Sequence, residues 1–103
     1  MSDCVFCKIA NHEIPAKIID ENEYVIAFED ASPVAPVHVL VIPKKHISNF
    51  MELDDENLEY VKEIHKMIQK VAKVKKVDET GFRVITNYGE DGGQTVMHLH
   101  YHI

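Results

Sequence analysis

The sequence predicts an α+β fold: a mostly antiparallel sheet of five strands, with one long helix and a short N-terminal helix or turn. Two observations predict this class. The β-rich stretches are joined by hairpin-like links, and a helical pattern occurs once instead of alternating with the strands. At 103 residues the chain has room for one core, so we expect a single domain over residues 1–103.

The first half of the chain predicts three strands. Residues 17–30 hold two β-rich stretches around the turn-prone residues 20–22, which is typical of a hairpin. Two prolines within residues 31–36 fix backbone angles and remove hydrogen-bond donors, so a loop follows the hairpin. Residues 37–42 form a β-branched run with little alternation. This pattern indicates a central strand covered on both faces, and Pro43 ends it.

The second half predicts the long helix and two more strands. Asp54 is a plausible N-cap for a helix that extends to about residue 76. Its apolar residues recur at spacings of three and four, which gives one buried stripe: Leu58, Val61, Ile64, Ile68 and Val71. Residues 82–87 form another strand, and the turn-rich residues 87–94 lead into the last one.

The last six residues place three histidines, His98, His100 and His102, at a spacing of two. On a β-strand this spacing points all three imidazoles to one face, while the apolar residues between them face the core. Histidine titrates near neutral pH and can act as nucleophile, acid, base or metal ligand. A purification tag or a solvated strand face can also be histidine-rich. The alternation with apolar residues argues against a tag.

Composition excludes some classes of partner. A formal net charge of −6 argues against a protein that coats nucleic acid, because phosphate backbones are bound mainly through clustered Lys and Arg. A small anionic ligand remains compatible with this charge, since a few local donors can hold it. No apolar run is long enough to span a bilayer and no targeting segment is evident. We therefore expect a cytoplasmic protein without a membrane partner.

The histidine strand resembles the histidine triad motif, His-φ-His-φ-His-φ-φ with φ apolar, which names the HIT superfamily. Other segments are similar to its histidine triad nucleotide-binding (HINT) branch: Phe6, residues 14–17, 30–33, Ala35-Pro36, His38, residues 41–48 and residues 92–94. The resemblance covers nearly the whole chain. It implies a HIT-like fold and a hydrolase that cleaves the P–N bond of nucleoside 5′-phosphoramidates, with a purine nucleotide such as AMP or GMP as ligand. It also implies a homodimer formed through the long helix and a neighbouring strand.

The resemblance assigns the catalytic histidines. His100 is the nucleophile, because an unprotonated imidazole can form a covalent phosphoryl-histidine that splits one hard displacement into two easier steps. We expect its other ring nitrogen to bond a backbone carbonyl, which fixes the tautomer. His102 would donate to the phosphate oxygens and assist the leaving amine. His38 and His98 complete the histidine cluster, and no metal is required for the chemistry.

The resemblance also implies nucleotide contacts. Asp30 would accept the two ribose hydroxyls, although capping of the following turn is an alternative. Val5, Phe6 and Phe28 would form an apolar cleft for the base. Without the resemblance, all three would be assigned to the hydrophobic core. The phosphate region would be contacted by Asn87, Gly93, Gln94 and Thr95. Gly92 and Gly93 allow close approach of backbone N–H groups to an anion, but a Gly-Gly pair alone is usually only a turn.

Cys4 and Cys7 form a C-x-x-C pair, the only cysteines of the chain. In a cytosolic protein this spacing indicates half a zinc site or a redox pair. A closed zinc site takes four N or S ligands, and His46 and His98 are the candidates that complete it. Many bacterial-type members of the HINT branch carry a structural zinc held in this way. The alternatives are two reduced cysteines without metal and a thioredoxin-like role, which the lack of a preceding strand disfavours.

One feature of the sequence departs from the family pattern. The sequence stops at Ile103, without the last apolar residue of the motif and the Gly- and Arg-containing tail that usually follows. This departure bears on substrate specificity and dimerisation.

Three alternatives to a phosphoramidate hydrolase stay open. They are a nucleotide-binding or scaffold module with residual hydrolysis, a dinucleoside polyphosphate hydrolase, and a metalloenzyme with zinc on His98, His100 and His102.

Overall fold

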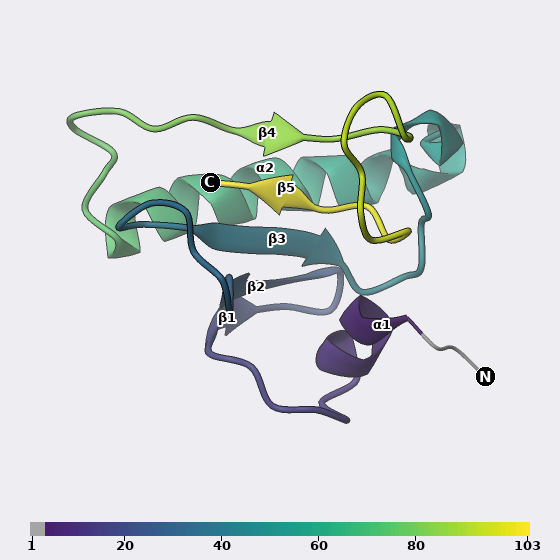
Figure 1. The fold of residues 1–103 in the computed structure, drawn as a ribbon, viewed down its shortest axis with the longest axis horizontal. Coiled ribbons are helices and arrows are strands. Elements are labelled where there is room, and N and C mark those ends of the chain that lie inside the picture. Colours follow the sequence, from purple (N-terminus) through teal and green to yellow (C-terminus); the bar gives the residue numbers. More distant parts are fainter. Residues whose placement is uncertain (1–3) are drawn as a thin grey trace.

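The computed structural model describes residues 4–103 and confirms the α+β class (Figure 1). Its helices are α1 (Val5–Ala10) and α2 (Leu58–Val74), with short 3₁₀ turns η1 (Phe50–Glu52) and η2 (Asp55–Asn57) before α2. Its strands are β1 (Ile18–Glu21), β2 (Val25–Glu29), β3 (Val39–Pro43), β4 (Ile85–Thr86) and β5 (Tyr101–His102). They form one sheet in the order β1-β2-β3-β5-β4, with every neighbouring pair antiparallel.

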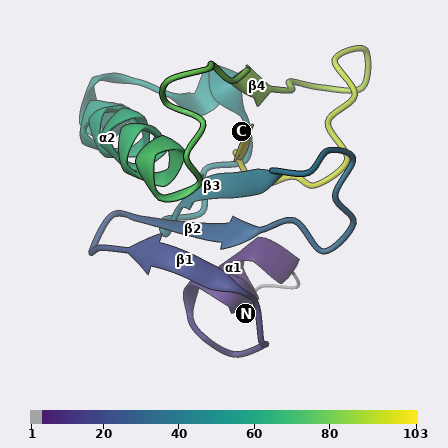
Figure 2. The same cartoon turned by 90° about the vertical axis from the view of Figure 1, so that its left-hand side faces the viewer.

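The two helices cover opposite faces of this sheet (Figure 2). On β3, Val39 and Val41 belong to the apolar cluster that includes α2, whereas Leu40 and Ile42 belong to the cluster that includes α1. All four side chains are buried. The absence of alternation therefore has the predicted cause, a central strand covered on both sides. The bounds differ from those predicted, because β3 begins at Val39 instead of Val37 and includes Pro43.

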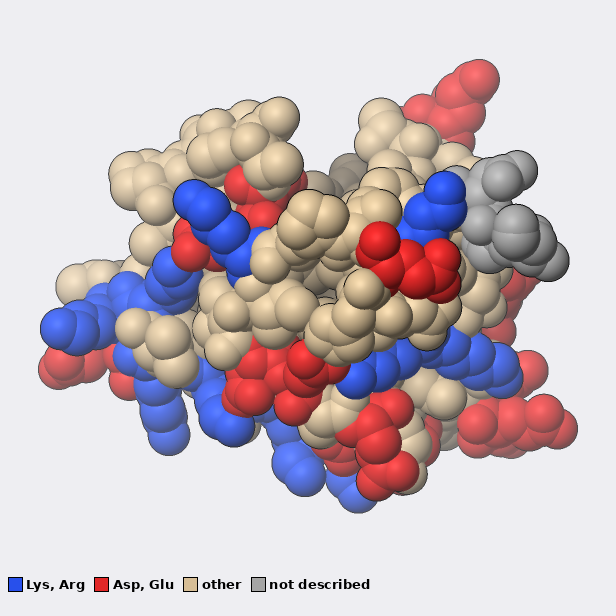
Figure 3. All heavy atoms as spheres, turned by 90° about the horizontal axis from the view of Figure 1, so that it is seen from below, with Lys and Arg blue, Asp and Glu red and all other residues tan. Residues whose placement is uncertain are grey.

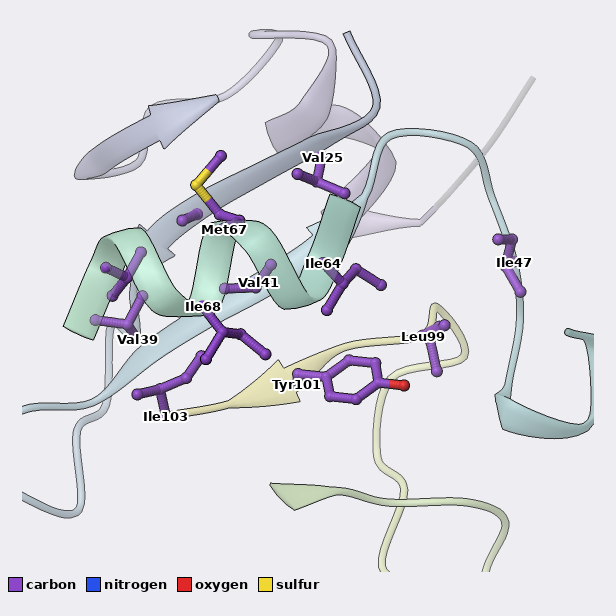
Figure 4. Close-up of a cluster of buried hydrophobic side chains, with 12 residues drawn as sticks. Val25, Val39, Val41, Ile47, Ile64, Met67, Ile68, Leu99, Tyr101 and Ile103 are labelled. Carbon is purple, nitrogen blue, oxygen red and sulfur yellow. The ribbon is translucent and has the colours of Figure 1, made fainter. Parts of the chain in front are cut away.

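The larger cluster lies between α2 and the sheet (Figure 4). Ile64, Ile68 and Val71 of the predicted stripe are buried there. From the histidine strand, the side chains of Leu99, Tyr101 and Ile103 enter the same cluster. The alternation of the last strand thus puts its apolar side against α2, as the sequence predicts.

Several predicted boundaries are wrong, for local reasons. The hairpin turn lies at residues 22–24 instead of 20–22, because the Asn22 side chain accepts the backbone N–H groups of Tyr24 (2.8 Å) and Val25 (3.0 Å). Asp54 does act as a cap, but its carboxylate accepts N–H groups of the 3₁₀ turn η2, so α2 begins at Leu58. Leu58 is 53% exposed and lies outside the buried stripe.

The two C-terminal strands are shorter than predicted. The strand expected over 82–87 is reduced to β4, which lies at one edge of the sheet. In residues 98–100, backbone groups bond outside the ladder: the Leu99 N–H donates to the Ile47 carbonyl (2.6 Å), and the His100 carbonyl accepts from Thr86 Oγ1 (2.8 Å). Side-chain and loop contacts therefore replace strand pairing at the start of the histidine motif.

The surface in Figure 3 mixes charges of both signs. Lys and Arg side chains alternate there with Asp and Glu side chains, so this face carries no continuous basic stretch for a phosphate backbone. Among residues 4–103, no helix combines the length and the apolar character needed to cross a membrane.

The packing of the histidine strand gives a stability prediction. Leu99→Ala should lower the free energy of unfolding by about 2–5 kcal/mol, because it leaves a cavity at a side chain with 0% exposure. Met97→Ala is the matched control on the same segment; its side chain is 53% exposed, and the change should be within about 0.5 kcal/mol. Urea unfolding measures both. Equal effects of the two substitutions would contradict the assigned orientation of the strand.

Candidate functional site

The structure gives the three triad histidines different surroundings. His98 has 0% exposure and contacts the cysteines of the N-terminal segment, whereas His100 and His102 line a cleft. His98 does not line that cleft in the described part of the chain. His98 and His100 are both buried, with 0% and 5% exposure, but only His100 and His102 line the cleft.

His100 has the geometry of a nucleophile. Its Nδ1 lies 2.7 Å from the backbone carbonyl oxygen of His98. Because a carbonyl only accepts, Nδ1 carries the proton and the neutral ring keeps a lone pair on Nε2. This hydrogen bond is the one expected from the sequence.

His38 and His102 form a hydrogen-bonded pair whose polarity follows from the backbone. The Val34 N–H donates to His38 Nδ1 (3.1 Å), so the proton of the neutral His38 ring lies on Nε2. His38 Nε2 is 2.9 Å from His102 Nδ1 and donates to it. The proton of a neutral His102 ring is then on Nε2.

The surroundings of His102 disfavour its charged form. Burial is the main cause that lowers the pKa of His102 below its ordinary value of 6.5, and the neighbouring His100 and His38 lower it further. The Asp30 carboxylate acts in the opposite direction. Asp30 Oδ2 lies 3.4 Å from His38 Nε2, so its negative charge lies directly beside the histidine pair.

Asp30, His38 and His102 bring their donor atoms within 4.8 Å of one another, which is close enough for a metal ion. Their hydrogen bonds argue against one. A metal on His38 Nε2 would leave the proton on Nδ1, directed at the Val34 N–H, whereas metal-bound histidines usually donate from their other nitrogen. This group is better suited to holding and moving protons.

The cleft beside these histidines has a volume of about 680 Å³, within the usual range of small-ligand sites. Five of the residues predicted to bind a nucleotide line it: Val5, Phe6, Phe28, Asp30 and Thr95. Ile9 and Leu40 extend its apolar wall. They were missed because their apolar patterns also indicate core. The three-residue spacing from Phe6 to Ile9 on α1 is the signal that could have identified Ile9.

Asp30 already has partners within the protein. Its Oδ1 accepts the Ser32 N–H at 2.8 Å, which is the turn-capping alternative. Because an ionised carboxylate has about four lone-pair sites, these contacts leave acceptors for a ribose. Binding of ribose by Asp30 stays a prediction.

Gln94 is buried, and internal hydrogen bonds occupy its side-chain amide. Its Oε1 accepts the Gly89 N–H (3.0 Å), and its Nε2 donates to the carbonyls of Ser48 (2.8 Å) and Val96 (3.0 Å). Both amide hydrogens are thus used within the protein. Gln94 therefore stabilises the loop by linking Gly89, Ser48 and Val96. Its contact with phosphate stays a prediction.

The rest of the loop is shaped by its own contacts. Asn87 Nδ2 donates to the Gly92 carbonyl at 2.7 Å. Gly93 has a positive φ of 79°, which favours glycine. At Gly92 a Cβ atom would collide with the Tyr88 carbonyl oxygen. Neither Asn87 nor Gly93 belongs to the described cleft lining, so their phosphate contacts also stay predictions.

The second constellation is the metal cluster, which we define as Cys4, Cys7, His46 and His98. One potential ligand atom from each residue lies within 4.8 Å of the others. His98 Nδ1 is 3.3 Å from Cys4 Sγ and 3.5 Å from Cys7 Sγ, and His46 Nδ1 is 3.2 Å from Cys7 Sγ. A tetrahedral zinc ion holds sulfur and nitrogen ligands about 3.6 Å apart, so these residues fit zinc. The sequence predicted this grouping.

The surroundings of His98 also fit a ligand role. Its Nε2 lies 2.8 Å from the Pro43 carbonyl, which places the ring proton there and leaves Nδ1 directed at the cysteines. Burial lowers the pKa of His98 to about 4, so the ring is neutral at neutral pH. With both nitrogens engaged, His98 is suited to a structural role instead of acid–base catalysis. The alternative of one metal on all three triad histidines is not supported, because His102 Nδ1 faces His38 instead.

Comparisons with known proteins agree with the residues brought together here. The HIT domain family matches residues 11–103. An uncharacterised HIT-like protein of Methanocaldococcus jannaschii is 44% identical over 101 residues, covering 97% of this chain and 76% of that protein. A histidine triad protein from Clostridium difficile is 54% identical in sequence and similar in structure, with a TM-score of 0.94 over 99% of this chain and 89% of that one.

A HIT family hydrolase from Clostridium thermocellum gives a TM-score of 0.96 at 51% identity, again over 99% of this chain and 89% of that one. A match over most of the chain, with the triad and its carbonyl contact in place, shows the family. The chain belongs to the HIT family.

Proposed function

We propose that this protein hydrolyses the P–N bond of purine nucleoside 5′-phosphoramidates through a nucleotidyl-His100 intermediate. The observation that carries the proposal is the hydrogen bond from His100 Nδ1 to the His98 carbonyl (2.7 Å), because it leaves an Nε2 lone pair at a cleft of nucleotide size. The apolar wall formed by Val5, Phe6 and Phe28 suits a planar base. Similarity to a HIT family hydrolase supports hydrolysis in general.

In the first step, His100 Nε2 attacks phosphorus and the P–N bond to the amine breaks. The nucleotidyl group is then covalently attached to the imidazole. The leaving nitrogen takes up one proton. His102 lines the same cleft, and in its imidazolium form, which the bound phosphoryl group favours, it delivers this proton from Nε2 and becomes neutral.

In the second step, water attacks phosphorus and the bond to His100 Nε2 breaks, which releases the nucleoside monophosphate. The proton lost by water returns to His102, so the enzyme ends in its starting state. A bound anionic phosphoryl group raises the pKa of His102, because an opposite charge favours the imidazolium. The Asp30 carboxylate supports the same charged form of His102, because its negative charge also raises the pKa of this ring.

We also propose that the metal cluster holds a structural zinc ion that takes no part in these steps. Its four donors complete a tetrahedral set, which leaves no open position for substrate. Thiolate ligands need a reducing compartment, and this supports a cytoplasmic location.

A homodimer is the expected assembly. Strand β4 is one of the two edge strands of the sheet, and Phe82 and Val84, which precede it, are 43% and 44% exposed. Phe82 also lines an apolar hollow of about 390 Å³ that reaches His38 and His102. A second copy of the chain would cover this edge and hollow.

The catalytic assignment predicts the effect of two histidine substitutions. His100→Ala should lower kcat for an adenosine 5′-alkylphosphoramidate by at least about 10³-fold, because the covalent route is lost. His65→Ala, at an exposed position on α2, should leave kcat unchanged. Release of AMP is the measurement, made at saturating substrate with and without chelator.

Two results would redirect the proposal. If the wild-type chain binds AMP but hydrolyses nothing, a nucleotide-binding module is the better description. If a dinucleoside polyphosphate outcompetes the phosphoramidate, the substrate class is wrong.

The electrostatics of His102 predict a ligand-dependent titration. In the free protein its pKa should lie below 6.5, and Asp30→Asn should lower it further, because the carboxylate stabilises the imidazolium. AMP should raise it. Imidazole resonances followed by NMR across pH 4–8 report each value, and a His102 pKa that AMP leaves unchanged would contradict the proposed proton donor.

The dimer proposal predicts that Phe82→Asp weakens self-association by placing a charge in the interface. Sedimentation velocity over a concentration series measures the monomer fraction. Met51→Asp is the surface control, because Met51 is 68% exposed and lies outside both α2 and β4. A wild-type chain that stays monomeric at high concentration would refute the dimer.

A further inference from the structure

We propose that the metal cluster is a positioning device for the nucleotide cleft, so that metal and nucleotide each strengthen binding of the other. This inference rests on the proposed nucleotide and zinc sites. It follows from the position of α1, because this one helix supplies residues to both. Cys7 belongs to the metal cluster, and Val5, Phe6 and Ile9 line the cleft.

Helix α1 depends on its contacts for its position. It has six residues, and helices of this length are unstable in isolation. Cys4 caps it, with Sγ accepting the Cys7 N–H at 3.4 Å. The first turn of α1 is therefore built around the two sulfur atoms that would hold the metal.

Phe6 connects the cluster to the reacting histidine. Its ring makes edge contacts with His98, at a centroid distance of 5.9 Å, and with His100, at 5.1 Å. It also contacts Phe28, at a centroid distance of 5.7 Å. A shift of α1 would therefore move the ring that separates the cluster from the cleft.

The main core does not depend on this arrangement. The cluster of apolar side chains under α2 contains residues of β2, β3 and the histidine strand but none of α1. Helix α1 packs instead on the opposite face, against Ile26, Phe28, Leu40 and Ile42. Loss of metal should therefore loosen α1 and one wall of the cleft while the sheet and α2 remain folded.

The expected coupling has a definite sign and a check. The first ligand to bind meets the entropy cost of ordering α1. The second ligand then binds to a helix that is already ordered, so the coupling is positive. By thermodynamic linkage, the factor by which zinc tightens AMP equals the factor by which AMP tightens zinc. Coupling between sites is typically about 5- to 150-fold, and we expect at least about 5-fold.

The experiment uses the full chain, with Zn²⁺ and AMP as probes. Calorimetry gives the Kd of AMP for the chelator-treated and the zinc-loaded protein. Competition with a chromophoric chelator gives the Kd of zinc with and without saturating AMP. Hydrogen exchange follows the amides of Cys7 to Asn11, and near-UV circular dichroism checks the rest of the fold. We expect an AMP Kd at least about 5-fold lower with zinc, the same factor for zinc with AMP, and zinc-dependent protection confined to α1.

Three substitutions separate positioning from general stabilisation. His46→Ala removes an exposed ligand and should abolish the effect of zinc on AMP binding. His46→Cys restores a fourth donor and should recover it. Phe6→Leu keeps an apolar side chain but loses the ring contacts, so it should reduce the coupling factor even though zinc still binds.

Each other outcome is decisive. An equal AMP Kd with and without zinc in a folded protein overturns the coupling and leaves the nucleotide function standing. Loss of tertiary structure throughout the chain on chelation also overturns it, because the cluster would then support the whole fold. If AMP binds neither form, the proposed function fails together with the inference.

Discussion

The hydrogen bond between His100 Nδ1 and the His98 carbonyl fixes which atom of His100 can react. It depends on the placement of residue 98, whose ring is held between the Pro43 carbonyl and the cysteines. Residue 98 thus uses its side chain to anchor the strand and its main chain to orient the nucleophile. The hydrogen bond thus fixes the reactive imidazole although His100 lies just before strand β5 and not within it.

The two-sided sheet makes this division of roles possible. In the last strand, Leu99, Tyr101 and Ile103 are packed against α2, and this packing fixes the register of the histidines on the other face. A slip of one residue would exchange the two sets of side chains. Burial of the three apolar side chains therefore also fixes the positions of the histidines on the opposite face.

Much of this could be predicted from the sequence, because the signals were periodic or chemical. The triad alternation, the cysteine pair of the metal cluster and a central strand that starts within residues 37–42 follow from spacing and residue type. The choice of His46 and His98 as the other two members came from the family resemblance. The helix start and the hairpin turn were misplaced, because Asp54 and Asn22 bond nearby backbone groups in ways that several sequences allow. The role of Gln94 in linking its loop to Ser48 could not be predicted, since Ser48 lies 46 residues away in sequence. Similarly, the polarity of the His38–His102 pair is set by one backbone N–H of an irregular loop.

The central claim is that the nucleotide is carried covalently on His100 between the two steps. The most direct measurement is rapid quenching of the reaction with an adenosine phosphoramidate, followed by peptide mass spectrometry. The account predicts one adenylyl group on the peptide that contains His100, labile to acid and absent in His100→Ala. Turnover of the wild-type chain with water attacking phosphorus directly, shown by inversion of configuration at a chiral phosphorus centre and no adduct at any time, would contradict it.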